Sequence, residues 1–512
     1  MLKRCIYGQA LDRHKTLPFH GDETYRFPGY ELFNAGRDIN DWVCLETRSA
    51  DSAFEFVAAA EALAEMLGGP EGARLRALAE QVRAATESLY WQSELGFYAP
   101  SRSDFAPTVH HYPFANINLR PLWVGYGKAS DPRQAQNVLA SLRYLWRGNG
   151  LVKTTPFCGY YVGMTPGYVV WNLAELRHPA VTKALKGMLD CAEGSGGYAE
   201  MIEPDDRPAS EVWGLHRARP WEGGINAEAA IHAITGYEPD APRGRASLRP
   251  LLVAGSSLRV RRLPLGNMAI SFSLVESRPG HRVYRIEVEG PQPARASVDL
   301  AVVVWGSGLR LGRIEAKNSA QVHPAPGPSW PWAQELHIDG LEVTPDYPAV
   351  VSVSYTPAPA TASLPTAVAF AYPQPNLPGG VRAIVVTPSA DKVQEAQARY
   401  GSVWAVDTKI PWPPDYLRAA LISSGRPRVA SVILDVDGFP GAFKRREFWT
   451  KGEGRRIIDE YKNCGGRVEN VLRPSPPPKP RAALPALSAS PSHVTTTTQP
   501  EPLSSAPASA DR

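Results

Sequence analysis

Hydrophobic residues in the N-terminal part of the chain recur at the spacing of an α-helix. Segments 52–67 and 75–89 each place apolar side chains three and four positions apart, so each is predicted to form an amphipathic helix. Ser52 followed by Glu55 matches a capping box at the start of the first helix. Residues 68–70, Gly-Gly-Pro, end that helix. The short connection predicts that the two helices pack as an antiparallel hairpin.

Further helices are predicted downstream of this hairpin. Asp131 supplies an N-cap and Pro132 the first helical residue of one of them. Residues 168–189 and 225–234 repeat the helical period, which brings the predicted total to about six or seven helices. Long connections in a compact helical domain often carry function, and two of them are rich in aromatic residues and Gly: 97–114 and 151–166.

Near Ser247 the hydrophobic period changes to two, the period of a β-strand with one buried face. Turn residues such as Gly266 and Asn267 separate the runs, so we expect antiparallel strands packed as a β-sandwich. The alternating runs are 258–260, 268–274, 284–288, 298–304 and 351–355.

The C-terminal part changes character twice more. After Pro373, short apolar runs alternate with helical segments, as in a small three-layer α/β domain. From about Pro474 the sequence has too few large apolar residues to fold and is predicted to be a disordered tail. The sequence thus predicts a multidomain α + β protein with four parts: a helical domain 1–243, an antiparallel β-sandwich 244–360, an α/β domain 373–472 and a Pro/Ser/Thr-rich tail 473–512.

One motif in the α/β segment has a local resemblance of its own. Residues 432–438, Val-Ile-Leu-Asp-Val-Asp-Gly, look like the opening motif of haloacid-dehalogenase-type phosphatases. That family needs further strands that carry its other catalytic residues, and one helix and one strand are predicted to follow here. Asp407, Asp435 and Asp437 are instead expected at the carboxyl ends of parallel strands, where open α/β sheets often bind a ligand.

Composition excludes several classes of partner. The 512 residues carry 55 Lys and Arg against 51 Asp and Glu, and the basic residues are dispersed, so no nucleic-acid-binding surface is predicted. No apolar run reaches membrane-spanning length, so no membrane partner is expected. Residues 1–10 lack an apolar signal segment, which indicates a cytoplasmic chain; a truncated N-terminus would leave a periplasmic or secreted protein open. The sequence does not define the oligomeric state.

The five cysteines predict neither a disulfide framework nor a metal site. They are odd in number and scattered, without a Cys-x-x-Cys pair or a His at ligand spacing. His110 and His111 lack a spaced partner, so no metal is expected, and no cofactor is expected either. The cysteines are Cys5, Cys44, Cys158, Cys191 and Cys464.

The segment from His20 to Tyr25 concentrates reactive groups within one turn. Asp22 and Glu23 are adjacent carboxylates, and His20 and Tyr25 beside them are candidates for substrate binding. Cleavage of a glycosidic bond needs one carboxylic acid to protonate the leaving oxygen and a second carboxylate to activate water or attack the sugar. Two acidic residues can also simply cap a helix. Both interpretations of Asp22 and Glu23 stay open at this point.

A second acidic cluster lies much later in the chain. Glu200 and Glu203 precede the last predicted helix, and Glu222 follows them between an Arg-Pro-Trp run and two glycines. Any of these three carboxylates could face a central cleft, and Glu200 is the preferred candidate for a general base. Arg219 could hold substrate hydroxyls or take part in a structural ion pair.

Aromatic residues in the long connections favour a carbohydrate site. Aromatic faces stack on sugar rings while covering apolar surface, although any single aromatic more often packs within the protein. His111 is expected to hydrogen-bond the substrate or the backbone. The aromatic candidates are Tyr112 and Trp221, with Trp91, Trp123, Tyr160, Tyr161 and Trp213 in support.

The order of these features resembles that of the six-hairpin glycosidases, whose catalytic domain is an (α/α)6 toroid. Helical hairpins with long loops come first, then residues 219–228, Arg-Pro-Trp-Glu-Gly-Gly-Ile-Asn-Ala-Glu, and then a sandwich introduced by 248–252, Leu-Arg-Pro-Leu-Leu; together they cover residues 10–360. Glucoamylases, α-L-rhamnosidases and inverting disaccharide phosphorylases share this architecture. The resemblance implies Glu23 as general acid and Glu200 as general base. It also implies a toroid incomplete at its N-terminal end, because a full one has more helices than this chain supplies.

Three functions are compatible with this resemblance. The first is hydrolysis of an O-glycosidic bond in an oligo- or polysaccharide, with inversion, by a carboxylic acid and a carboxylate. The second is carbohydrate binding without cleavage by a truncated relative. The third is phosphorolysis by an inverting disaccharide phosphorylase, which would need a cationic phosphate pocket such as Arg37, Arg217 and Arg219 could supply.

Overall fold

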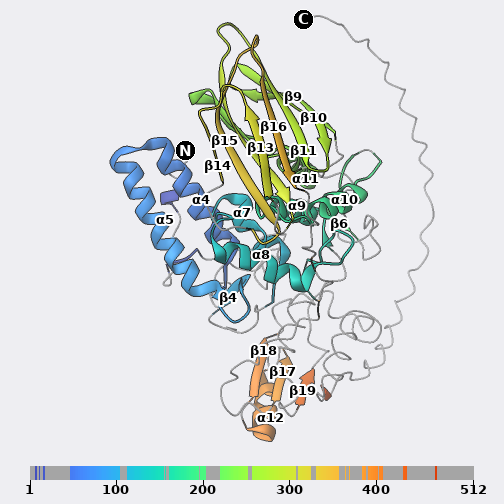
Figure 1. The fold of residues 1–512 in the computed structure, drawn as a ribbon. Coiled ribbons are helices and arrows are strands. Elements are labelled where there is room, and N and C mark those ends of the chain that lie inside the picture. Colours follow the sequence, from blue (N-terminus) through green and yellow to red (C-terminus); the bar gives the residue numbers. More distant parts are fainter. Residues whose placement is uncertain are drawn as a thin grey trace, which may run out of the picture.

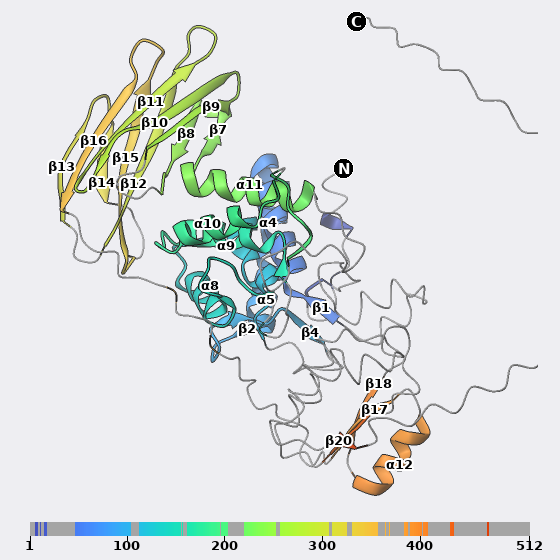
Figure 2. The ribbon, with the colours of Figure 1, turned by 90° about the vertical axis from the view of Figure 1, so that its right-hand side faces the viewer.

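The structure is a computed structural model of mixed helices and sheets (Figures 1 and 2). A helical unit, a two-sheet unit packed on it and a small C-terminal sheet make up its described part. The predicted tail 473–512 lies outside the described residues. The structure describes residues 6–8, 11, 15–17, 47–103, 112–154, 156, 161–194, 196–202, 220–251, 257–306, 310–324, 330–356, 364, 368, 383–387, 390–401, 403–407, 431–434 and 468–469.

The first predicted hairpin is confirmed. Helices α4 (Ala50–Leu67) and α5 (Gly69–Tyr90) lie side by side along their length. Gly68 connects them at a φ of 60°, a left-handed conformation that suits a residue without a Cβ, and its N–H donates to the carbonyl of Ala64 at 3.0 Å. Phe54 is fully buried on the apolar face that the sequence period indicated.

The predicted capping box at Ser52 is wrong. Helix α4 begins at Ala50, so Ser52 and Glu55 lie inside the helix and Ser49 is its N-cap residue. The hydroxyl of Ser49 contacts the carboxylate of Asp51 and makes no capping bond to a backbone N–H. Asp51 lies in the first turn of α4, where the helix dipole favours an acidic side chain.

The predicted helix 168–189 is two helices. Helix α9 (Thr165–Glu175) ends and α10 (Val181–Asp190) begins after a short break. Arg177 in this break adopts the left-handed conformation at a φ of 51°. Pro179 follows and has no N–H with which to continue a helix. The hydrophobic period runs through the break, which is why the sequence alone did not reveal it.

The last predicted helix, 225–234, begins earlier than expected. Helix α11 (Pro220–Thr235) includes Glu222 in its first turn, whereas the sequence placed that residue in a loop. Gly223 and Gly224 have low helix propensity and conceal this start in the sequence. The other described helices are α6 (Ala115–Asn118), α7 (Arg120–Val124) and α8 (Pro132–Leu145), and Asp131 caps α8 as predicted, accepting from the N–H of Arg133 at 2.9 Å.

Short antiparallel strand pairs lie inside the long connections of the helical unit. Two of the pairs bring together segments that are distant in sequence, and the third, β2 with β3, is a local hairpin. The pairs are β1 (Thr47–Ser49) with β4 (Ser101–Ser103), β2 (Trp91–Gln92) with β3 (Phe97–Tyr98), and β5 (Tyr161–Val162) with β6 (Met201–Ile202).

The predicted β-sandwich consists of two five-stranded sheets that share one core. The five runs of period two correspond to described strands β9, β10, β11, β12 and β16, and five further strands were not predicted. One sheet has the order β13 (Arg310–Ala316), β16 (Ala349–Thr356), β11 (His281–Glu289), β10 (Met268–Arg278) and β9 (Leu258–Leu265). The other has the order β14 (Gln321–Pro324), β15 (Ala333–Val343), β12 (Ala296–Trp305), β8 (Arg245–Leu248) and β7 (Glu238–Asp240).

The small C-terminal sheet is parallel throughout its described strands. Helix α12 (Ala390–Tyr400) follows its first strand and packs against it, the arrangement expected of an α/β unit. Asp407 ends one strand, as predicted, whereas Asp435 and Asp437 lie outside the described residues. The strand order is β18 (Val403–Asp407), β17 (Ala383–Thr387), β19 (Ser431–Leu434) and β20 (Val468–Glu469).

Within the described part of the chain, every helix is too short or too polar to cross a lipid bilayer.

Candidate active site

The first turns of several helices meet around Arg120, the first residue of α7. One guanidinium nitrogen of Arg120 lies 3.4 Å from Asp51 and 2.5 Å from Glu55, both on α4. The guanidinium also donates to the hydroxyl of Tyr168 on α9 at 3.3 Å and to the carbonyl of Asn116 at 3.2 Å. Asp51 and Arg120 are both buried, and a buried charge is tolerated only when it is paired in this way. The cluster therefore fixes α4, α7 and α9 relative to one another.

Tyr168 keeps its proton within this cluster. Burial raises its pKa to about 12, although the neighbouring Arg120 acts in the opposite direction. The edge of the Trp123 ring packs on the Tyr168 ring at a centroid separation of 5.1 Å. The indole N–H of Trp123 in turn donates to a carboxylate oxygen of Glu228 on α11 at 3.2 Å. An aromatic and acidic surface thus continues from α7 to α11.

Side chains of Asn and Thr join the same helix ends. Thr165, the first residue of α9, donates from its hydroxyl to Asn116 on α6 at 2.6 Å. The N–H of Ala115 donates to the carbonyl of Thr154 at 2.8 Å, and the hydroxyl of Thr154 accepts from the N–H of Val162 at 3.1 Å. Strand β5 is therefore tied to the start of α6 as well as to α9.

Gly163 is the closest point of contact between α9, α11 and strand β6. Its N–H donates to the carbonyl of Glu200 at 2.6 Å, and its carbonyl accepts from the side-chain amide of Asn226 at 2.9 Å. A Cβ at this position would lie 1.8 Å from the carbonyl oxygen of Ala199 and 3.1 Å from the Cγ of Glu222. Only glycine fits here, and its absence of a side chain lets the backbone before β6 and the side chain of Glu222 approach the same point.

The two carboxylates next to Gly163 differ in exposure. Glu222 is 1% exposed, in the first turn of α11, while Glu200 is partly exposed before β6. Trp221 stands beside Glu222 on the helix with 56% of its surface exposed, so the ring is available to a ligand. Tyr112, by contrast, is 3% exposed and packs within the helical unit.

Other residues proposed from the sequence lie outside the described part of the chain. The distance between the proposed acid and the proposed base is therefore not described, and their pairing stays a prediction. These residues are His20, Asp22, Glu23, Tyr25, His111, Glu203 and Arg219.

Sequence reasoning missed Asp51, Glu55 and Arg120. Asp51 was visible as an acid at the start of a predicted helix, which is a common position for a simple cap. Arg120 lies 69 residues away from Asp51, and no local pattern joins them. Only the packing of α4 against α7 brings the three charges together.

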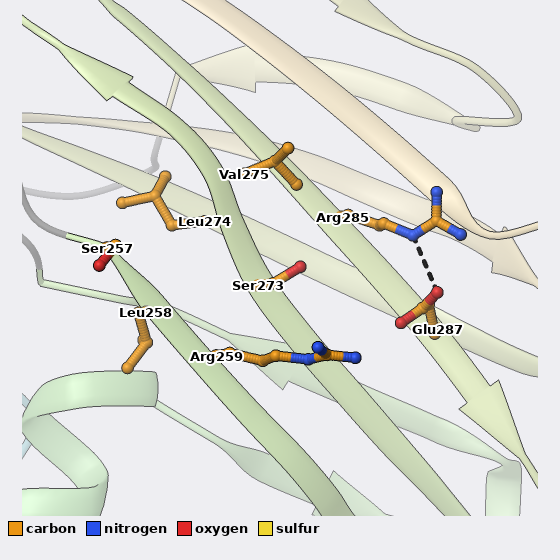
Figure 3. Close-up of a pocket in the computed structure, with 8 residues that line it drawn as sticks. All are labelled: Ser257, Leu258, Arg259, Ser273, Leu274, Val275, Arg285 and Glu287. Atoms are coloured by element: carbon orange, nitrogen blue, oxygen red, sulfur yellow. Dashed lines mark hydrogen bonds and ion pairs between the residues drawn. The ribbon is translucent and has the colours of Figure 1, made fainter.

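A separate hollow lies on the sandwich, away from these carboxylates (Figure 3). It is shallow and open, about 570 Å³ in volume, on the surface of β9, β10 and β11. The guanidinium of Arg285 donates to Glu287 at 2.8 Å along β11, with Arg259 and Ser273 on the neighbouring strands. An exposed ion pair on a flat strand surface is common without a ligand, so the helical end remains the better candidate site.

Comparison with known proteins returns no matching family model and no matching curated protein. Similar solved structures include an α-L-rhamnosidase from Dictyoglumus thermophilum, at 11% identity over 69% of this chain and 35% of that one, with a TM-score of 0.40. A GH78 family rhamnosidase of Bacillus sp. GL1 is 12% identical over 59% of this chain and 30% of that one, also with a TM-score of 0.40. A GH127 β-L-arabinofuranosidase from Geobacillus stearothermophilus T6 is 12% identical over 65% of this chain and 46% of that one, with a TM-score of 0.24.

The chain spans about a third of the length of the two rhamnosidases. All three proteins are glycosidases by name, and the TM-scores are too low to establish a shared fold.

Proposed function

We propose that this protein is a glycoside hydrolase that cleaves an O-glycosidic bond at the end of its helical unit where α4, α7, α9 and α11 begin. The observation that carries the proposal is that both described candidates for the general base lie beside Gly163, Glu200 through its backbone carbonyl and Glu222 through its side-chain stem. Glycosidic cleavage requires two carboxyl groups, and the proposal takes one of these two as the base and Glu23 as the acid. The resemblance of the sequence to six-hairpin glycosidases supports the same assignment, with the helical unit as an incomplete (α/α)6 toroid.

In this proposal the general base is Glu200, because its partial exposure lets its carboxylate reach a water molecule. Glu222 is the second candidate for that role, and its burial in the first turn of α11 fixes its position. The general acid is Glu23, with Asp22 beside it. The reaction proceeds with inversion if the acid and the base stand roughly 6.5 to 9.5 Å apart, which leaves room for water on the far face of the sugar.

Substrate binding in the proposal uses aromatic and polar groups around these carboxylates. The exposed ring of Trp221 offers a face on which a sugar can stack. Arg120 does not bind the sugar in this scheme, because its guanidinium is buried and occupied by Asp51, Glu55 and Tyr168. Its role is to hold α4, α7 and α9 together, so that Trp123 of α7 keeps its place beside Glu228 of α11.

The test is hydrolysis of a panel of aryl and natural glycosides by the full chain and by three variants: Glu23→Gln, Glu200→Gln and Glu222→Gln. Loss of a general acid or base typically costs about 10²- to 10⁴-fold in turnover. Glu94→Gln, in the exposed turn between β2 and β3, is the matched control and should keep full activity. Proton NMR of the first-formed sugar anomer distinguishes inversion from retention.

Each outcome of this test separates the candidate functions. Loss of activity in Glu23→Gln and Glu200→Gln, with circular dichroism unchanged, supports the assigned pair, whereas loss in Glu222→Gln in place of Glu200→Gln transfers the base role to Glu222. A native chain that binds oligosaccharides without cleaving any of the panel is a carbohydrate-binding protein. Turnover that depends on added phosphate identifies a phosphorylase.

A further inference from the structure

Two histidines and an aspartate project from one face of the sandwich where β14 pairs with β15. His323 lies directly opposite His337 in the register of these strands. Asp339 follows two residues after His337, so both point to the same face, while Ile338 between them is fully buried in the sandwich core. All three polar side chains are partly exposed, which leaves their donor atoms accessible from solvent.

The donor atoms of these side chains converge. One nitrogen from each imidazole and one carboxylate oxygen of Asp339 all lie within 4.8 Å of one another. The Nε2 of His323 is 2.6 Å from a carboxylate oxygen of Asp339, and the two imidazole ring centres are 5.6 Å apart. Within the described residues this is the one group of three His, Cys, Asp or Glu side chains that comes together in this way.

The hydrogen bonds behind His323 prepare it as a ligand. Its Nδ1 lies 2.8 Å from the carbonyl of Pro324, and a carbonyl can only accept, so Nδ1 carries the proton. Nε2 lies 2.6 Å from a carboxylate oxygen of Asp339, which also only accepts, so a metal ion would replace the proton that these two side chains share. A backbone carbonyl that accepts from the other ring nitrogen is a usual partner of a metal-bound histidine.

His337 has a carboxylate in the equivalent position. Its Nε2 lies 3.0 Å from Glu335. The carboxylate of Glu335 also accepts from the guanidinium of Arg177. A carboxylate accepts the Nε2 proton, which leaves Nδ1 with the lone pair in the neutral ring. A metal bound to Nδ1 of His337 leaves the hydrogen bond from Nε2 to Glu335 in place, whereas a metal bound to Nε2 would break it.

We propose that His323, His337 and Asp339 bind a divalent transition metal of the zinc class, with water in the fourth position. Two imidazoles and one carboxylate are a ligand set that suits zinc and its neighbours better than calcium or magnesium, which take mainly oxygen ligands. A tetrahedral site with zinc–ligand bonds of roughly 2.0 to 2.2 Å places its ligand atoms about 3.4 Å apart. The Nε2 of His323 and the Asp339 oxygen lie 2.6 Å apart and all three ligand atoms lie within 4.8 Å of one another, so the side chains would shift to reach that spacing.

Such a site would fasten the short edge strand β14 to the sheet. Strand β14 has four residues and makes its described strand pairing only with β15. The carboxylate of Glu335, which contacts His337, also contacts Arg177 of the helical unit, with a nitrogen to oxygen distance of 2.5 Å. The metal would therefore stabilise both the edge of the sandwich and its contact with the helices. This proposal is independent of the glycosidase assignment, and it departs from the sequence-based expectation of no metal.

The test uses the full chain, treated with a chelator and then titrated with Zn²⁺ by calorimetry. We expect one equivalent of Zn²⁺ to bind to the native chain. The affinity should be at least about tenfold weaker in His323→Gln and in Asp339→Asn, since even mutating a residue that only hydrogen-bonds a metal ligand lowers metal affinity about 10- to 100-fold. His281→Gln, another partly exposed histidine of the sandwich, is the matched control and should bind zinc like the native chain. Equal affinity in native, His323→Gln and Asp339→Asn chains would overturn the proposal.

Cobalt substitution gives a second readout that needs no variant. Co²⁺ bound to nitrogen and oxygen ligands in a tetrahedral site shows strong visible bands, and a thiolate ligand adds a near-ultraviolet charge-transfer band. Strong visible bands without the thiolate band support the site. Weak octahedral bands only, or a thiolate band that assigns the metal to a cysteine, contradict it even if the variants fail to fold. Zinc should also raise the thermal unfolding midpoint of the native chain and not of Asp339→Asn.

Discussion

The indole N–H of Trp305 donates a hydrogen bond to the backbone carbonyl of Arg177 at 2.8 Å. Trp332 makes the same contact with the carbonyl of Leu176 at 3.0 Å. These carbonyls lie immediately beyond α9, where the end of a helix leaves its last acceptors without intrahelical partners. Two tryptophans of the sandwich thus complete the end of a helix in the helical unit, and the two units share one buried cluster of apolar residues there.

Replacing Trp305 by Phe should weaken this junction. The phenyl ring retains most of the apolar contact but leaves the Arg177 carbonyl without its donor, which typically costs about 1 to 3 kcal/mol. Urea unfolding of the full chain measures the change. Tyr347→Phe, which alters a well-exposed aromatic of the sandwich, is the control and should leave the unfolding midpoint in place. An unchanged midpoint in Trp305→Phe would show that the indole contact contributes nothing to stability.

The same junction should weaken in acid. Burial lowers the pKa of His178 to about 4, so between pH 6.5 and 4 the unfolded chain binds a proton that the folded chain does not, and stability falls as the pH falls. Glu335, with its pKa lowered to about 2, adds a second loss as the pH falls from 4.5 toward 2. The loss between pH 6.5 and 4 should lower the free energy of unfolding by roughly 1 to 3 kcal/mol.

The contribution of His178 is tested by comparing the thermal unfolding midpoints of the native chain and of His178→Asn between pH 7 and pH 4. The Nδ1 of His178 accepts from the N–H of Ala180 at 3.1 Å, and an Asn oxygen can accept the same bond without titrating. The variant should show a flatter pH dependence than the native chain. If both lose stability equally between pH 6.5 and 4, the acid sensitivity belongs to another group.

Local periodicity accounts for the parts of the fold that the sequence predicted. The hairpin of α4 and α5 buries residues at helical spacing, and strands such as β11 and β16 bury every second residue. Both patterns are visible without tertiary information. Strand β14 lacks such a pattern, since its four residues are exposed or partly exposed and include Pro324. Its pairing partner, rather than its own sequence, makes it a strand.

The candidate site was only partly predictable for a related reason. Glu200 and Glu222 were identifiable as acids near aromatic residues, but their meeting point depends on Gly163, which no motif marked. Arg120 and Asp51 pair across 69 positions, and His323 faces His337 only through strand register. Contacts of this kind are consequences of packing, and one sequence does not reveal them.

Removing Arg120 should be strongly destabilising. Arg120→Leu would leave Asp51 buried without its cation, and breaking a buried ion pair from one side typically costs about 3 to 5 kcal/mol. The double variant Asp51→Asn with Arg120→Leu should regain part of this loss, because no uncompensated charge remains. Arg295→Leu removes an exposed arginine paired with Glu342 and should change stability much less. Equal losses in the single and double variants would contradict a role for charge.

A methyl group at Gly163 should disturb the segment around the candidate base. In Gly163→Ala the new Cβ would lie 1.8 Å from the Ala199 carbonyl and 3.1 Å from the Cγ of Glu222, so Gly163 and the segment before β6 must move apart, at a cost of about 1 to 3 kcal/mol. Activity should fall by more than the stability change explains, because a displacement near 1 Å at a catalytic site can cost about 10²-fold.

Gly224→Ala provides the matched control for this change. Gly224 is exposed on α11, and a Cβ added there would meet no atom within 4 Å, so alanine should stabilise the helix by up to about 1 kcal/mol. Turnover on the best glycoside of the panel and urea unfolding are measured for both variants. If Gly163→Ala keeps native turnover while folded, the segment at Gly163 does not position the general base, and the base must be sought elsewhere in the chain.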